Sequence, residues 1–141
     1  CVWGIFETIN KSDFDSVFYI AASLNSLVKL INIKLDQRKY QTISAGIGMD
    51  YGRTLMIQAG YRGSSLNEVV WMGKAVNNAC HLANKAGRHI QKDIIVSSEI
   101  YTKLKDEYKN VLFKYYDIEM CCNNYESYAV STSMDEWIKN N

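Results

Sequence analysis

Four polar side chains recur at spacings of three and four residues in one segment of the chain: Lys74, Asn77, His81 and Lys85. On a helix this spacing places them along one face, because residues three and four apart are neighbours on a helical surface. Ammonium, amide and imidazole groups can all donate to a phosphate or another oxyanion, and no carboxylate interrupts the series. The stripe is therefore a candidate site for an anionic ligand. The alternative is a solvated helix face, which surface helices carry by default.

Other candidate motifs indicate structure rather than chemistry. Gly46, Gly48 and Gly52 follow an expected strand, but a phosphate-binding glycine loop must open a helix, and here another strand follows. We therefore assign Gly46 and Gly48 to close packing and Gly52 to a turn. The two histidines, His81 and His89, are too few for a multi-histidine metal site, so no metal ligand is predicted within the chain.

Two helices are predicted to organise the fold around this stripe. The helix that carries the stripe is expected at residues 74–86, closed by Gly87. A longer amphipathic helix is expected at residues 14–35, where apolar residues recur at three and four after a polar capping segment at residues 10–13. A short helix at residues 98–105 and a final helical turn at residues 134–138 complete the helical set.

Short β-rich runs are predicted as strands at residues 1–7, 42–49, 54–59, 66–72, 94–96, 111–116 and 125–130. The turn residues at 50–53 predict a hairpin between the second and third of these strands. Hairpins mixed with crossover helices indicate an α+β or α/β fold in which helices cover a mixed sheet. Without repeats, prolines or low-complexity tracts to mark a boundary, residues 1–141 are expected to form a single domain.

The composition is that of an ordinary folded domain. The 141 residues are 48% hydrophobic, and 16 Lys and Arg against 15 Asp and Glu give a net charge of +1. This balance argues against binding to a nucleic-acid backbone. The four cysteines form no CxxC pair and are predicted to be reduced thiols of a cytoplasmic protein. No uninterrupted apolar run approaches the roughly 20 residues of a membrane helix, so no membrane partner is expected.

Three blocks of sequence resemble the class III nucleotide cyclases, in the same order and spacing: GIGMDYGRTLMIQAG, VVWMGKAVNNACHLANKAG and DIIVSSEIYTKL. In that family the blocks are a strand-turn-strand, a helix with the pattern Gly-Asp/Asn-x-Val-Asn-x-Ala-x-Arg, and a strand that runs into a helix. The resemblance covers residues 1 to about 116. It implies a ferredoxin-like cyclase catalytic domain whose N-terminal strand and helices are missing from this chain.

The resemblance also implies roles for individual residues. Asn77 falls on the asparagine that binds the ribose and orients the 3′-oxygen for attack on the α-phosphorus. His81 falls on the position of the family's transition-state arginine. An imidazolium there would donate one hydrogen bond to the α-phosphate, and only when the imidazole is protonated. Val70 falls on the base-selecting residue, and Trp71 and Met72 add bulk beside it.

The implied phosphate and metal groups depart from the family pattern or lie elsewhere. The family's Lys-Gly-Lys element would lie at residues 119–124, where EMCCNN holds no lysine, so the triphosphate is expected to be neutralised by Lys74, Lys85 or Arg88. Two Mg²⁺ or Mn²⁺ ions are implied, with aspartate ligands expected upstream of Cys1. A homodimer is also implied, with active sites shared between protomers.

Two hypotheses of different classes follow. The first is a cyclase that converts a nucleoside triphosphate to a 3′,5′-cyclic nucleotide and pyrophosphate, and the second is a cyclase-like module that binds without chemistry. Asn77 favours the first, while His81 keeps the second open. Because Val70 cannot hydrogen-bond a base edge, UTP or CTP is the expected substrate, with an adenylate or guanylate cyclase as the alternative. A short intact chain without sensor or membrane domains is expected, and in this it resembles the compact pyrimidine cyclases of the Pycsar antiphage system more than receptor-linked adenylate or guanylate cyclases.

Overall fold

The computed structural model describes residues 2–59, 68–88 and 92–140. Its elements, in chain order, are α1 (Lys11–Gln37), β1 (Ile47–Met49), β2 (Leu55–Ala59), β3 (Glu68–Met72), α2 (Lys74–Lys85), β4 (Ile94–Ser97), α3 (Ser98–Lys103), α4 (Asp106–Lys109), β5 (Phe113–Asp117), β6 (Cys122–Ser127) and α5 (Thr132–Asn140). This order confirms the α+β class and most of the predicted elements. The short helix α4 was not predicted.

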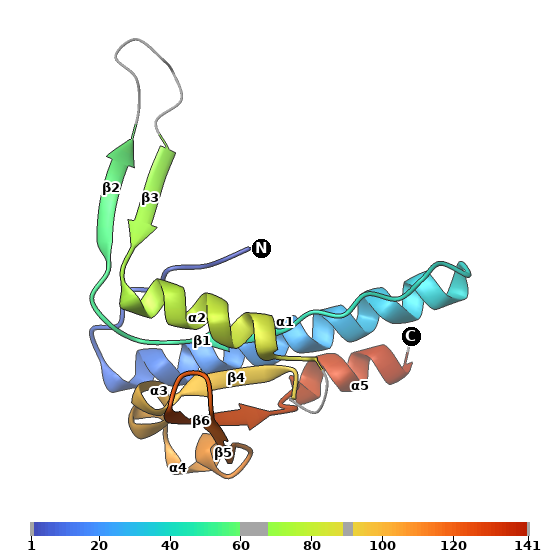
Figure 1. Cartoon of the computed structure of the whole chain (residues 1–141). Coiled ribbons are helices and arrows are strands. Elements are labelled where there is room, and N and C mark those ends of the chain that lie inside the picture. Colours follow the sequence, from blue (N-terminus) through green and yellow to red (C-terminus); the bar gives the residue numbers. More distant parts are fainter. Residues whose placement is uncertain (1, 60–67, 89–91, 141) are drawn as a thin grey trace.

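Four strands form a mixed sheet in the order β1, β4, β6, β5. β1 runs parallel to β4, and β6 runs antiparallel to both β4 and β5. β2 and β3 form a separate antiparallel hairpin, with Ile57 opposite Val70. This hairpin projects away from the rest of the molecule (Figure 1).

The hairpin predicted between residues 42–49 and 54–59 is wrong. β1 begins only at Ile47 and pairs with β4, whereas β2 pairs with β3. Residues 50–53 therefore connect two sheets. The physical reason is burial: Met49 at the end of β1 packs in the core, while Leu55 at the start of β2 is 61% exposed. Turn residues indicate where the chain turns, but they do not specify which strand pairs with which.

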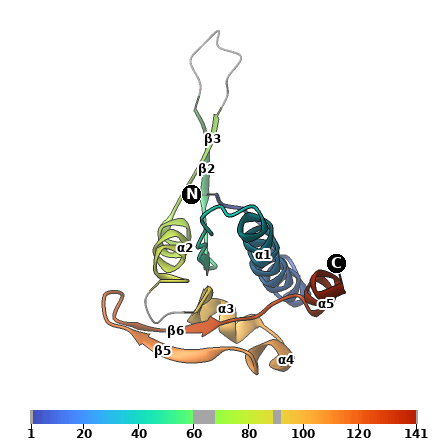
Figure 2. The same ribbon diagram turned by 90° about the vertical axis from the view of Figure 1, so that its right-hand side faces the viewer.

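Helices cover both faces of the sheet at its β1–β4 end. Side chains alternate along a strand, so Ile94 and Val96 point to one face and Ile95 to the other. Ile94 and Val96 pack in the core cluster that contains Phe18 of α1. Ile95 packs in a second cluster with Leu82 of α2. Figure 2 shows α1 and α2 on the two sides of this part of the sheet.

The start of α1 is fixed by its predicted polar cap. The Asp13 carboxylate accepts hydrogen bonds from the backbone amides of Asn10, at 2.7 Å, and Ile9, at 2.9 Å. These amides lie at the helix N-terminus, where no carbonyl of the helix can pair with them. The polar segment therefore contains the helix start, as predicted, but α1 begins at Lys11 rather than at residue 14: Asn10 is the N-cap and Asp13 lies in the first turn.

The buried face of α1 differs from the predicted apolar stripe in its second half. Leu24 and Leu27 are 47% and 40% exposed, while Asn25 and Ser26 are buried. The Ser26 hydroxyl donates to Oδ1 of Asp135 in α5 at 2.9 Å. The second half of α1 is thus anchored to α5 through polar contacts that helical periodicity does not predict.

Among the described residues, α1 is the one helix long and apolar enough, by length and composition, to cross a bilayer. The sequence expectation considered only uninterrupted apolar runs and therefore did not single out α1, whose whole composition meets this criterion. Helices that pack in a protein core meet the same criterion, and Phe14 and Phe18 of α1 pack in the core. The finding therefore assigns no location to the chain.

The strand predicted at residues 1–7 is also wrong for the described residues, 2–7. Residues 2–9 form no strand, because no described segment pairs with them. Trp3 and Ile5 instead line a shallow hollow together with Val69 and Trp71 of β3. An apolar, β-rich segment forms a strand only where a neighbour accepts and donates its backbone hydrogen bonds.

Candidate active site

Helix α2 is positioned by close backbone packing against β1. A Cβ atom on Gly46 would collide with the carbonyl oxygens of Ala83 and Ala86, and one on Gly48 with backbone atoms of Ala79 and Ala83. Only glycine allows a helix backbone to lie this close to a strand. The assignment of both glycines to close packing is confirmed, and their neighbour is the helix that carries the polar stripe.

The orientation of α2 follows from its buried face. Ala75, Val76 and Leu82 are buried, whereas Cys80 is exposed. Residues 79, 83 and 86 contact Gly46 and Gly48, so the side of α2 that carries them faces the sheet. Cys80 lies on another side of the helix. The helix ends before Gly87, whose φ of 67° favours glycine, as predicted.

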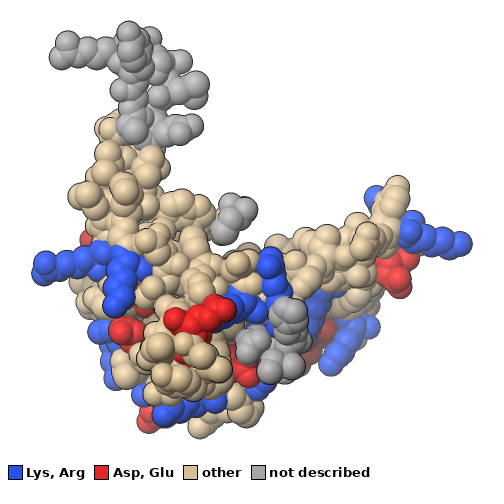
Figure 3. Space-filling view, viewed as in Figure 1, with Lys and Arg blue, Asp and Glu red and all other residues tan. Residues whose placement is uncertain are grey.

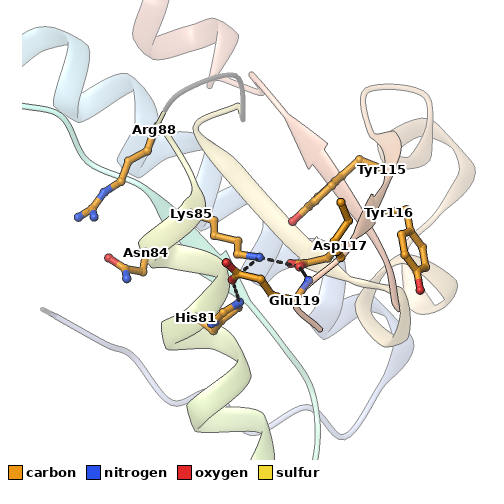
Figure 4. A pocket seen from close by; sticks show the side chains of 9 residues that line it. His81, Asn84, Lys85, Arg88, Tyr115, Tyr116, Asp117 and Glu119 are labelled. Carbon is orange, nitrogen blue, oxygen red and sulfur yellow. Dashed lines mark hydrogen bonds and ion pairs between the residues drawn. The ribbon is translucent and has the colours of Figure 1, made fainter. Parts of the chain in front are cut away.

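The second half of α2 and the connection between β5 and β6 enclose an open pocket of about 460 Å³ (Figure 4). One wall consists of hydrogen-bond donors from α2 and the residues after it: His81, Asn84, Lys85 and Arg88. The other wall comes from β5 and the following turn: Tyr115, Tyr116, Asp117, Ile118 and Glu119. The pocket thus joins two segments that lie about 30 residues apart in the chain.

An ion network crosses this pocket. The ammonium nitrogen of Lys85 lies 2.6 Å from Oδ1 of Asp117 and 2.9 Å from Oε2 of Glu119. The Nε2 atom of His81 lies 3.4 Å from the same Oε2. The side chain of Asp117 is fully buried, while that of Glu119 is 70% exposed. Lys85 is therefore held between one fixed and one exposed carboxylate.

The backbone of the turn stabilises the charged form of Asp117. Its Oδ1 atom accepts hydrogen bonds from the amides of Glu119, at 3.1 Å, and Met120, at 3.2 Å, in addition to Lys85. Burial alone would raise the pKa of Asp117, but the Lys85 ammonium and these amides outweigh it and lower the pKa. Burial likewise opposes the charge on Lys85, yet its hydrogen bonds to both carboxylates raise its pKa.

Tyr115 adds a neutral phenol to the pocket wall. Burial, followed by the negative charge of Asp117, raises the pKa of Tyr115 to about 12. The hydroxyl group therefore stays protonated at any physiological pH, and it offers a hydrogen-bond donor beside the ion network.

His81, Asp117 and Glu119 form a group that could hold a metal ion, since each offers a ligand atom within 4.8 Å of the others. A metal ion there would have to displace the Lys85 ammonium, which already contacts both carboxylates. The group offers one nitrogen and two carboxylates for a single ion. It therefore does not fit the pair of oxygen-bound cations that the resemblance implies.

The structure divides the predicted site residues into two groups. His81, Lys85 and Arg88 line the pocket together. Lys74 and Asn77 lie exposed on the first half of α2, outside the pocket lining. Val70 and Met72 lie on β3, 38% and 52% exposed, and they do not line the pocket either.

Sequence reasoning missed Asn84 of α2 and the whole opposite wall of the pocket, which includes two tyrosines, Ile118 and the carboxylates of Asp117 and Glu119. No local pattern singles out Asp117 and Glu119, because their partner, Lys85, lies more than 30 residues earlier. The one available signal was the expectation that residues 119–124 lie near the phosphates, which draws attention to Glu119 but not to Asp117.

Fold and pocket together define an α+β protein with an open, charged pocket beside its second helix. No protein-family model matches the chain. A uridylate cyclase of Treponema porcinum is 31% identical over 144 residues, which cover 96% of this chain and 50% of the relative. Uridylate cyclases of Gulbenkiania mobilis and Burkholderia cepacia are 30% and 32% identical, over 82% and 77% of this chain and 48% and 45% of their own lengths.

These matches extend over most of the chain, so the chain is similar to these uridylate cyclases along the part of their length that it spans. It spans about half the length of the relatives it matches. The resemblance to a nucleotide cyclase is thereby confirmed, and the activity of the whole protein is a separate question.

Proposed function

We propose that this chain is part of a class III nucleotide cyclase with a ferredoxin-like catalytic domain that converts UTP or CTP to a 3′,5′-cyclic nucleotide and pyrophosphate. The observation that carries the proposal is the similarity to relatives named uridylate cyclases, the first of which covers 96% of this chain. The donors along α2 supply the groups that such a reaction needs. A role in antiphage defence and a cytoplasmic location are further parts of the proposal, which rest on the sequence alone.

The proposed reaction is an intramolecular displacement at phosphorus. The 3′-oxygen of the ribose forms a bond to the α-phosphorus and loses its proton. The bond from the α-phosphorus to the oxygen that bridges to the β-phosphate breaks, and pyrophosphate leaves with that oxygen. Negative charge develops on the α-phosphate and on the leaving group, so positioned cations and hydrogen-bond donors lower the barrier.

The predicted site residues on α2, and Arg88 just after it, each have a role in this proposal. Asn77 binds the ribose and orients the 3′-oxygen, and His81 donates to the α-phosphate one helical turn later. Lys85 and Arg88, which share the pocket with His81, neutralise the β- and γ-phosphates, and Lys74 adds positive charge at the start of the helix. Two divalent cations, with ligands outside this chain, would activate the 3′-hydroxyl and neutralise the phosphates.

Selection of the base is assigned to the β3 wall. Val70 has no donor or acceptor and Met72 is large, so this wall discriminates mainly by size. A pyrimidine ring is smaller than a purine ring and suits a crowded, apolar wall. Both side chains are exposed in the isolated chain, and they are available to a base held against β3.

A homodimer with shared active sites is part of the proposal. The β2–β3 hairpin stands apart from the core, and its described part presents an almost uncharged surface (Figure 3). Leu55, Met56 and Val69 are each at least 49% exposed. A lone two-stranded sheet is marginally stable in water, and such apolar surface usually marks an interface. A second copy would cover the hairpin and bring further groups to the exposed Asn77.

The second candidate is a nucleotide-binding module without chemistry. It is favoured by one observation, that Lys85 is already paired with two carboxylates and His81 with one. The full-length protein, incubated with Mn²⁺ and each of ATP, GTP, CTP and UTP, separates the two when products are resolved by mass spectrometry. We expect cUMP or cCMP as the main product. Predominant cAMP or cGMP would contradict the pyrimidine substrate, and no cyclic product would contradict the cyclase.

A further inference from the structure

The two carboxylates that contact Lys85 differ in how firmly they are held. Asp117 is fully buried, and its Oδ1 atom also accepts two backbone hydrogen bonds. Glu119 is 70% exposed and lies in the turn between β5 and β6. Breaking the contacts of a buried carboxylate costs far more than moving an exposed one into water. Of the two, only Glu119 can leave Lys85 readily.

The position of the Glu119 carboxylate is that of a bound anion. Its Oε2 atom lies 2.9 Å from the Lys85 ammonium and 3.4 Å from Nε2 of His81. Figure 4 shows it between these two side chains of α2. A phosphate oxygen accepts from the same donors as a carboxylate oxygen. The free protein therefore fills the space between two of its anion-binding groups with an anion of its own.

We infer that Glu119 is an internal competitor for the phosphate groups of the substrate, and that nucleotide binding displaces its carboxylate from Lys85 and His81. This inference rests on the proposed function for the identity of the ligand, the polyphosphate end of a nucleoside triphosphate. Asp117 stays in place during the exchange and keeps Lys85 pointed into the pocket. When pyrophosphate leaves, Glu119 returns and helps to expel it.

The test is the affinity of the full-length protein for inorganic pyrophosphate, measured by isothermal titration calorimetry in EDTA, so that metal binding does not contribute. Glu119→Gln removes the competing charge with little change of shape. We expect it to tighten pyrophosphate binding about two- to fivefold, the range of an exposed ion pair. Glu107→Gln on α4 is the matched control, because it removes the same charge from a helix that does not line the pocket. It should leave the affinity unchanged.

A second pair of variants tests the mechanism of the gain. In a Lys85→Met background the Glu119→Gln substitution should tighten pyrophosphate binding less than in the unaltered protein, because the nearer of the two shared partners is gone and only His81 remains. Unchanged or weaker binding by Glu119→Gln in the otherwise unaltered protein would overturn the inference. Pyrophosphate binding can be measured without catalysis. The proposed function and the inference about Glu119 are therefore tested independently of each other. A protein that makes no cyclic nucleotide but gains affinity in Glu119→Gln would contradict only the proposed function, and the reverse result would contradict only this inference.

Discussion

The ammonium nitrogen of Lys85 lies 2.6 Å from Oδ1 of the buried Asp117, and this contact joins α2 to the end of β5. The same oxygen accepts the backbone amides of Glu119 and Met120, so one carboxylate fixes both the lysine and the turn. The pocket between α2 and β5 therefore depends on Asp117, although Asp117 itself need not touch a ligand. It acts as a positioning residue.

Replacing Asp117 with Asn should destabilise the protein by about 1–3 kcal/mol, the usual cost of losing hydrogen bonds to a buried charged group. The midpoint of urea unfolding measures this loss. Asp106→Asn is the matched control, because the side chain of Asp106 is 98% exposed, and its midpoint should not change. An Asp117→Asn protein as stable as the unaltered one would show that the buried ion pair contributes nothing to the fold.

Tyr115 should ionise near pH 12 rather than near its ordinary pKa of 10.0. Folding favours the neutral phenol, so the stability it contributes is full below pH 10.0 and is lost as the pH rises through about 12. The difference in phenolate absorbance between the unaltered protein and Tyr115→Phe isolates this group among the ten tyrosines. A midpoint of that difference near pH 10.0 would contradict its burial beside Asp117.

Gly48→Ala should destabilise the protein by about 1–3 kcal/mol, as overpacking does, because the added methyl group meets the backbone of α2. Displacing α2 should also lower activity. Gly52→Ala provides the comparison, since its Cβ would lie 3.2 Å from a single methyl group, that of Ala75, and a milder effect is expected. Thermal unfolding of both variants distinguishes them. Equal stability of the two would contradict the close packing at Gly48.

His81→Ala should lower kcat on the order of 10²-fold, the usual loss for one donor to a transition state. His81→Arg should retain more activity, because a guanidinium can donate two hydrogen bonds to one phosphate. Steady-state kinetics with UTP in the full-length protein measures both. An unchanged kcat in His81→Ala would assign the charge stabilisation to another group.

Local sequence signals predicted the elements that local chemistry determines. The cap before α1, the polar stripe of α2 and the glycine that ends α2 depend on residues within a few positions of one another, and the structure has all three. The close approach at Gly46 and Gly48 was also predicted, though the neighbouring helix was not identified as its cause.

Long-range pairing was not predictable from the same signals. β1 pairs with β4, with Ile47 opposite Ile94, and no local pattern distinguishes that partner from the adjacent β2. The contact of Lys85 with Asp117 likewise joins residues 32 positions apart. The roles of the predicted site residues therefore stay a prediction, and half of the wall of the pocket that His81, Lys85 and Arg88 line comes from β5 and the turn after it.

The most direct test of the account is the rate of cyclic nucleotide formation by the full-length protein carrying Asn77→Ala. Asn77 is exposed on α2, so its loss should leave the fold intact, and the account predicts that kcat falls by about 10²-fold or more. Asn78→Ala, one position along the same helix and on a different face, should retain nearly full activity. Equal activity of the Asn77→Ala and unaltered proteins would contradict the central claim that this face of α2 carries the catalytic site.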